Sequence, residues 1–439
     1  MSASSITPHA PRASAKSTAS ATPATPRSGA VSVRRHELDW LRTAAVFGLI
    51  PFHTAVIFTT GSYDYVKNAQ TSALMDVFTS FISLWGISLL FLVAGGASRF
   101  ALASRSVGQY LNERVTRLLI PFVVGMLVIV PLQVYVGRLS APTPAPSFPA
   151  FYIGFIGTVF GIFTGHIPNG PEWIGHLWFI PPLIAFSALA LPFARLLRTP
   201  RGARAVSTLA SAGRGYLPLA LFGLPLVAVQ YFALEGVGWF PTIDSRVTTN
   251  AMGIVAYLIF FLYGYLLYLD DRFITSVRRD AWLALALGTA AWLIIVFVVP
   301  LTRPDVMSAS LGHVFAALMR GYCSWWWVMG ILGMGARYLQ FTTPAVSYLT
   351  QAAYPVYIIH MLILSVIGME VVRWDLGILP KFALIVLATL AISLIVYEVL
   401  IRRIGVLRLI FGLRPRAPAA APPVASGSVA RHDPTRPSI

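Results

Sequence analysis

The sequence predicts an all-α fold, a polytopic transmembrane helical bundle of about ten spans with both termini cytoplasmic. Three observations lead to this prediction. Of the 439 residues, 56% are hydrophobic and 11% are charged, a composition typical of a polytopic membrane protein. The apolar residues form runs of about 20, the length that crosses a bilayer as a helix. Basic residues gather in the short segments between these runs, as the positive-inside rule requires.

The two ends of the chain are expected to lie outside the bundle. Residues 1–33 are rich in Ser, Ala, Thr and Pro, and residues 414–439 in Pro, Ala, Ser and Arg. Neither segment has the apolar side chains needed to form a core. We therefore expect two disordered cytoplasmic tails, with residues 34–413 forming one membrane domain. The first tail lacks a continuous apolar segment, so we do not expect it to be a secretory signal peptide.

Ten apolar segments are long enough to be spans. They are residues 38–58, 74–97, 118–137, 176–194, 216–234, 247–269, 281–300, 311–334, 352–372 and 379–401. A further segment, 151–164, is short and glycine-rich, and its placement decides the topology. If this segment is a re-entrant or interfacial helix, every arginine-rich connection lies on the cytoplasmic side. If it is a full span, the arginines of 195–214 lie outside, against the positive-inside rule. We therefore favour ten spans, with this segment not counted.

The charge and the single cysteine limit the possible functions. The formal net charge of +17 is explained by topology and by contacts with anionic lipid, not by binding of nucleic acid. Cys323 is the only cysteine, which excludes an intrachain disulfide and a cysteine metal cluster. The sequence has no GxSxG, GxxxxGK[ST] or HExxH motif. We expect neither a metal nor a permanently bound cofactor.

The segment HELDWLRTAAVFGLIPFHT, residues 36–54, carries ionisable groups inside an apolar run. Arg42 and His53 return to within about 20° of one helical face, roughly 16 Å apart along the axis. Asp39, one turn before Arg42, falls on that face too. Ionisable groups at membrane depth normally face a bundle interior or a watered cavity and mark a site, and Pro51 opens the helix beside His53. The alternative is a juxtamembrane ion pair of Asp39 and Arg42, with His53 a structural hydrogen bonder.

Arg114 and Arg117 lie in NERVTRLLIP, where the third predicted span begins. Residues three apart share one face of an α-helix, here at the cytoplasmic boundary. Two guanidinium groups so placed are suited to binding phosphate. The alternative is ordinary positive-inside anchoring of the helix end.

Four more residues are predicted to line a substrate site: His176, Arg320, Tyr357 and His360. His176 stands in GHLWFI at the outer mouth of the fourth span, where a solvated interfacial residue is the alternative. Tyr357 and His360 are one turn apart in YPVYIIHML, with His360 about 13 Å into the ninth span. They form either an interhelical hydrogen-bonded pair or part of a cavity lining. Arg320 lies mid-run in the eighth span and must face the bundle.

A membrane-embedded histidine with arginines below it is compatible with general-base group transfer. A transporter or lipid flippase is the main alternative, because intramembrane Arg and His can also line the path of a polar substrate. The chain lacks paired interrupted helices in corresponding halves, which would favour that alternative. A non-catalytic assembly protein is a third possibility, but it would not need His53 and Arg42 on one face.

Taken together, these residues resemble acyltransferase family 3, a family of integral-membrane O-acyltransferases. The family's first span, R/K followed by ten residues and H and preceded by LDxLR, is matched by Leu38, Asp39, Leu41, Arg42 and His53. Its R-x-x-R is matched by Arg114 and Arg117, and YPVYIIHM is similar to a late family motif. HLWFI, followed by two prolines, looks like the branch that includes the succinyltransferase of periplasmic glucan synthesis.

The resemblance implies that acyl-CoA on the cytoplasmic side of a bacterial-type inner membrane gives up its acyl group to a hydroxyl at or beyond the outer face. It implies His53 as the catalytic histidine, with Arg42 and Asp39 beneath it. It places Arg114 and Arg117 near the donor phosphates. The acceptor is expected to be a carbohydrate or a related molecule, and the acyl group stays open between acetyl and succinyl.

Overall fold

The structure is a computed structural model that describes residues 35–61, 66–140, 143–161, 164, 173–212, 216–236, 251–298 and 311–413. These residues form helices and their connections, and no strand occurs among them. The prediction of an all-α fold is confirmed. The two tails predicted to be disordered, residues 1–33 and 414–439, lie outside the described residues.

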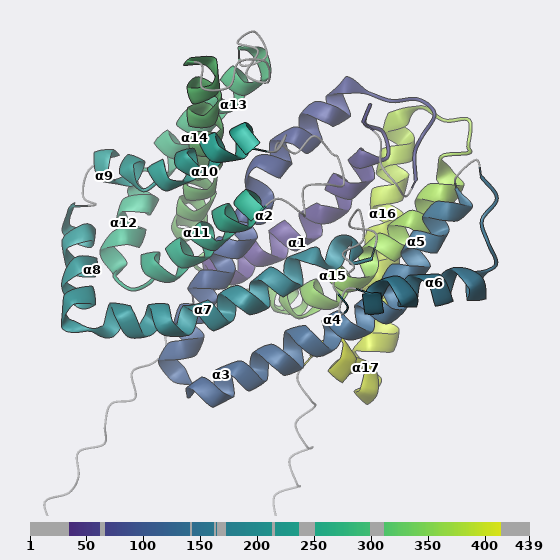
Figure 1. Cartoon of the computed structure of the whole chain (residues 1–439), viewed down its shortest axis with the longest axis horizontal. Coiled ribbons are helices and arrows are strands. Elements are labelled where there is room, and N and C mark those ends of the chain that lie inside the picture. The colour runs from purple at the N-terminus through teal and green to yellow at the C-terminus, as the bar shows by residue number, and fades with distance from the viewer. Residues whose placement is uncertain are drawn as a thin grey trace, which may run out of the picture. The chain divides into compact units, whose positions relative to one another are not determined.

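The described helices are drawn in Figure 1. They are α1 (His36–Val56), α2 (Ala73–Ser104), α3 (Val107–Arg114), α4 (Ile120–Val124), α5 (Val130–Leu139), α6 (Phe148–Gly161), α7 (Ile180–Arg198), α8 (Pro200–Ala212), α9 (Tyr216–Leu221), α10 (Leu224–Gly236), α11 (Ala251–Leu267), α12 (Asp271–Arg279), α13 (Ala281–Phe297), α14 (Leu311–Tyr338), α15 (Pro344–Val371), α16 (Ile378–Val396) and α17 (Gly405–Ile410). The 3-10 helix η4 (Gly175–Phe179) leads into α7, and the π-helix η7 (Tyr397–Ile401) continues α16.

Five helical segments of the described chain are long and apolar enough to cross a membrane, or six if a bent pair is one span. The five are Ala73–Ser104, Val107–Leu139, Gly175–Arg198, Pro344–Val371 and Ile378–Ile401, and the pair Gly253–Leu267 and Asp271–Arg279 is bent by 109°. The chain is therefore an integral membrane protein. Ten spans and the sides of the termini stay predictions. Both α1 and α14, predicted as spans, are outside the five because they carry polar and ionisable residues.

Proline shapes the long helical segment from α3 to α5. Two π-helical turns, η1 (Val115–Leu119) and η2 (Gly125–Ile129), interrupt it, and each is followed closely by a proline, Pro121 or Pro131. A proline has no N–H and leaves the carbonyl four residues earlier without its helical donor. The carbonyl freed by Pro131 is that of Leu127, and the Tyr152 hydroxyl of α6 donates to it at 3.0 Å. The short helix α6 is thus docked on this segment.

Helix α1 is central to the described bundle. It packs against α2, α14, α15 and α16, and α15 packs in turn against α5 and α16 (Figure 1). Two contacts show that α1 and α2 run antiparallel: Leu38 faces Gly96, and Thr60 N–H donates to Asp76 at 3.0 Å. The first turn of α1 is therefore level with the second half of α2. His53 lies toward the opposite end of α1.

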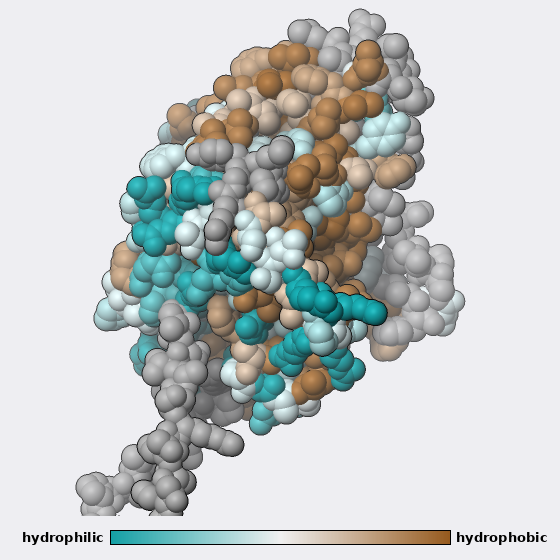
Figure 2. Space-filling view, turned by 90° about the vertical axis from the view of Figure 1, so that its left-hand side faces the viewer, coloured by the Kyte–Doolittle hydropathy of each residue, from teal (hydrophilic) through white to brown (hydrophobic). Residues whose placement is uncertain are grey.

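A polar boundary is visible on the side of the bundle that carries α8 and α12. Figure 2 shows hydrophilic residues gathered in the lower part of this face and hydrophobic residues covering its upper part. Exposed arginines of these two helices include Arg201, Arg204 and Arg278. Two of the arginine-rich connections that we predicted between spans, the ones that contain α8 and α12, thus lie beside an apolar region.

Candidate active site

His53 stands near the end of α1 and is half-buried. Its Nδ1 is buried and makes no hydrogen bond within the described residues. The imidazole lies between two rings, with centroid separations of 5.0 Å to Phe52 and 5.6 Å to His360. The partner that approaches His53 from another helix is therefore a second histidine.

His360 is fully buried on α15, and its backbone fixes its tautomer. Its Nδ1 lies 2.8 Å from the Tyr357 carbonyl oxygen and 3.2 Å from that of Val356. Carbonyl oxygens only accept hydrogen bonds, so Nδ1 carries the hydrogen and Nε2 keeps a lone pair. That Nε2 is buried and has no hydrogen-bond partner among the described residues. His360 therefore keeps a buried acceptor nitrogen in the ring that contacts His53.

His176 is buried beside His360, not solvated at an interface, so the interfacial alternative is excluded. Gly175, with φ 51°, adopts the left-handed conformation that favours glycine and turns the chain into η4 just before it. His176 Nε2 donates to the Ile358 carbonyl oxygen at 3.0 Å, and Nδ1 lies 2.8 Å from the Gln133 side chain. With the Gln133 amide turned so that its NH2 faces Nδ1, both groups are satisfied.

Tyr357 completes the arrangement. Its hydroxyl donates to the His176 carbonyl oxygen at 2.6 Å. The His176 ring lies 5.7 Å from the Tyr357 ring and 5.3 Å from the His360 ring. We call His53, His176 and His360 the histidine cluster. The structure thus brings together four of the predicted site residues, three histidines and Tyr357, from α1, η4 and α15.

Gln133 on α5 is a site residue that the sequence reasoning missed. It is completely buried and holds His176. Its signal in the sequence is a glutamine inside the apolar run IVPLQVYV, since a buried amide needs hydrogen-bond partners. Both nitrogens of His176 are engaged, so the cluster is not arranged as a three-histidine metal site.

Asp39 and Arg42 form an ion pair of 2.7 Å near the beginning of α1. Their side chains are 20% and 40% exposed, respectively. They share a helical face with His53, as predicted, but they lie three turns away from it, too far for a direct contact. The structure therefore supports the ion-pair interpretation of these two residues. A role in the reaction can only be indirect.

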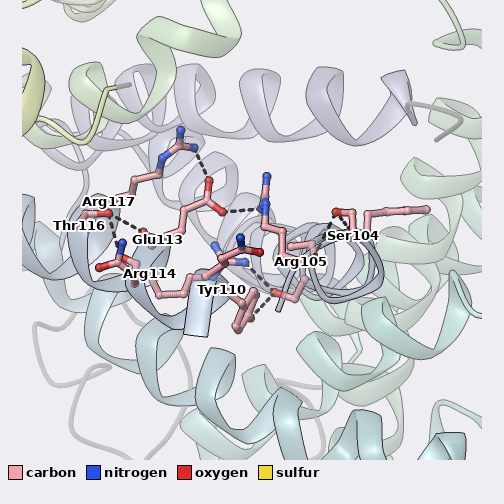
Figure 3. Close-up of polar contacts among 12 residues, drawn as sticks. Ser104, Arg105, Tyr110, Glu113, Arg114, Thr116 and Arg117 are labelled. Carbon is pink, nitrogen blue, oxygen red and sulfur yellow. Dashed lines mark hydrogen bonds and ion pairs between the residues drawn. The ribbon is translucent and has the colours of Figure 1, made fainter. Parts of the chain in front are cut away.

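Arg114 and Arg117 engage different partners. Figure 3 shows Glu113 between Arg105 and Arg117, and its carboxylate accepts from both. Arg114 instead donates to the Ser98 hydroxyl at 3.0 Å and lies over the Tyr110 ring at 4.8 Å. The π-helical turn η1 separates the two arginines, and its wider turn moves residues three apart away from a common face. The two arginines therefore contact different groups, and their binding of phosphate stays a prediction.

Arg320 lies elsewhere in the bundle. It is half-buried on α14, which packs chiefly against α13 and α10, whereas Tyr357 and His360 are on α15. His313, on the same helix, is buried and contacts the Tyr231 carbonyl oxygen at 3.1 Å. A contribution of Arg320 to substrate binding stays a prediction.

Comparison with known proteins agrees with this site. The pattern of the acyltransferase domain of acyltransferase family 3 matches residues 35–398. Glucans biosynthesis protein C of Salmonella typhi is 24% identical over 400 residues, covering 87% of this chain and 95% of the relative. The protein of that name from Escherichia coli O157:H7 is 22% identical over 405 residues, with the same coverage. No solved structure matches. The chain therefore belongs to acyltransferase family 3 and is a membrane-integral acyltransferase.

Proposed function

We propose that this enzyme moves an acyl group, acetyl or succinyl, from cytoplasmic acyl-CoA to a hydroxyl of a carbohydrate at or beyond the outer membrane face. His53 is the general base. The single observation that carries the proposal is the meeting of His53 with His360, whose free lone pair is buried beside it. The names of the relatives, which concern glucan biosynthesis, support a carbohydrate acceptor.

His360 is the nearest candidate for the orienting partner that a catalytic histidine needs. The two rings lie 5.6 Å apart, and neither His53 Nδ1 nor His360 Nε2 has a hydrogen-bond partner among the described residues. Since His360 Nε2 can only accept, we propose that His53 turns its Nδ1–H toward it during the reaction, which leaves the lone pair of His53 on Nε2. An imidazole held in one tautomer by a neighbour is the arrangement used for proton abstraction in hydrolases.

The reaction then follows from this tautomer. His53 Nε2 accepts the proton of the acceptor hydroxyl while that oxygen attacks the thioester carbonyl carbon. The C–S bond breaks, CoA leaves as a thiolate, and the proton on His53 Nε2 returns to the sulfur. The products are the O-acyl ester and free CoA. Gln133 and Tyr357 hold His176, whose ring packs against His360, and so keep the cluster in place.

A topology of ten spans with both termini cytoplasmic is part of the proposal. Arg114 and Arg117 then lie on the inner side, and His53, near the far end of α1, lies in the outer half of the membrane. A donor entering from inside and an acceptor outside can meet at such a position. The arginine-rich ends of α8 and α12 support this orientation.

The test replaces His53 in cells and in the purified enzyme. His53→Ala and His53→Gln are expected to insert, to bind acyl-CoA and to lose transfer by about 10² to 10⁴ in rate, since glutamine cannot take up the proton. Mass spectrometry of surface glycans detects the loss of the mass of the acyl ester.

His36→Gln, the same change at the first residue of the same helix, is the control and should transfer normally. Near-normal transfer by folded His53→Gln would make His53 a structural residue. Missing export of the glycan, with its esters intact, would point to a transporter.

A further inference from the structure

Three arginines on α2, α3 and α7 have no carboxylate partner among the described residues. They are Arg99 on α2, Arg114 at the end of α3 and Arg198 at the end of α7, and we call them the arginine triad. Their neighbours Arg105 and Arg117 differ, because both pair with the Glu113 carboxylate (Figure 3). Arginines with a carboxylate partner and arginines without one therefore lie close together in this region.

The triad surrounds one polar patch on α2. Ser98 Oγ accepts from Arg114 at 3.0 Å and from the Tyr110 hydroxyl at 3.2 Å. One turn further along α2, the Leu102 carbonyl oxygen accepts from Arg198 at 3.1 Å. Arg99 directly follows Ser98 in the chain. The Tyr265 hydroxyl lies within electrostatic range of Arg99, Arg198 and the Tyr110 hydroxyl.

The charge of the triad is not balanced by any nearby acid. Arg99 and Arg114 are half-buried, and the Nε of each is buried with no hydrogen-bond acceptor among the described residues. Glu113 is taken by its two arginines, and buried Glu37 faces the Tyr268 hydroxyl at 3.4 Å. Cationic groups that lose water without an anion are costly. An anion carrying several oxygens would satisfy these donors.

We propose that the arginine triad binds a phosphate group, and that this phosphate belongs to the acyl donor; the second part rests on the proposed function. Planar guanidinium groups are suited to phosphate because each presents a fork of donors. Arg114 keeps its predicted role, while Arg99 and Arg198 are new to the site. Arg117 acts instead through Glu113, as a positioning residue.

The distance to the histidine cluster fits such a donor. Tyr268 touches Gly96 and Glu37, so the first turn of α1 is level with the triad's part of α2. His53 comes sixteen positions after Glu37 on α1, which is roughly 24 Å along the axis. A donor held here by its phosphates must reach His53 through a long arm, and CoA carries its thioester at the end of such an arm.

The test measures binding of CoA to the purified full-length protein in nanodiscs of neutral lipid. Arg99→Gln and Arg198→Gln are expected to weaken CoA binding by about 10-fold or more, as the loss of a charge-assisted hydrogen bond does. Arg105→Gln removes the same charge nearby from an ion pair and should change the affinity by less than about threefold. Arg198 is exposed, so Arg198→Gln remains informative if Arg99→Gln fails to fold.

Three outcomes would overturn the proposal. Unchanged CoA affinity in both folded variants would remove the phosphate site. An equal loss in Arg105→Gln would show a general effect of net charge. The third outcome is measured by native mass spectrometry with added phosphatidylglycerol. If the arginine variants lose bound lipid but still bind CoA, the triad binds a lipid headgroup instead. Arg99-dependent CoA binding without detectable acyl transfer would leave the site intact and refute the proposed function alone.

Discussion

Three histidines in this protein differ in what they can do, although the side chain is the same. His176 has partners on both nitrogens, His360 on one, and His53 Nδ1 has none among the described residues. The difference comes from the backbone around each ring, because carbonyl oxygens fix which nitrogen holds the hydrogen. At the scale of the residue, the hydrogen-bond partners of an imidazole decide whether it has a structural role or can act as a general base.

Gln133 tests this support. Gln133→Leu keeps the size of the side chain but leaves His176 Nδ1 buried without a partner, which costs about 1 to 3 kcal/mol. We expect a lower midpoint of thermal unfolding in detergent and slower acyl transfer, with CoA affinity unchanged. Gln351→Leu, an exposed glutamine that bonds only within α15, is the control. Transfer at the wild-type rate in Gln133→Leu would show that His176 does not support the cluster.

At the scale of the element, the bundle depends on close approach of helix backbones. Helices α2 and α11 meet through two glycines, Gly95 and Gly264. A Cβ on Gly95 would lie 1.9 Å from the Phe261 carbonyl oxygen, and one on Gly264 would lie 1.9 Å from that of Leu92. Small residues allow such contacts in membrane proteins, where apolar surface alone does not drive helices together.

Gly264→Ala is therefore expected to disrupt this interface, since the added methyl group meets backbone that cannot move aside. The loss should exceed the roughly 1 to 3 kcal/mol of ordinary overpacking. Size-exclusion chromatography of a fluorescent fusion would report the folded fraction. Gly48→Ala on α1 is the matched control, because nothing lies within 4 Å of its Cβ position. A Gly264→Ala variant as stable as Gly48→Ala would refute the close packing.

At the scale of the whole molecule, the side of each connection decides whether donor and acceptor can meet. Cysteine labelling suits this question because the native Cys323 is fully buried. Ser147 and Arg204 are exposed and lie in segments predicted on opposite sides. Gly202 would be a poor labelling position, since its Cβ would lie 2.2 Å from the Leu196 carbonyl oxygen.

We expect Ser147→Cys to react with a membrane-impermeant maleimide in intact cells, and Arg204→Cys to react only after permeabilisation. The reason is the positive-inside rule, which keeps the arginines of α8 on the cytoplasmic side. Each variant should retain acyl transfer, which serves as the control for folding. Labelling of Arg204→Cys in intact cells would contradict the ten-span topology.

The sequence alone determined the all-α class, the membrane character and four of the polar residues that meet in the site, but not Gln133. Helix class follows from the length of the apolar runs, and His53, His176, Tyr357 and His360 stand out because ionisable or hydrogen-bonding groups are rare inside them. The family was likewise recognisable from LDWLR, RVTR and YPVYIIHM, and the comparison confirms it.

The tertiary structure alone decided which of these residues meet. Helical periodicity assigns a residue to a face of its own helix, but it does not say which other helix covers that face. Asp39 and Arg42 share a face with His53 and pair with each other, while His53 meets a histidine more than 300 residues later in the chain. The π-helical turn at η1 and the carboxylate of Glu113 separate Arg117 from Arg114. Such pairings depend on long-range packing, which local spacing does not encode.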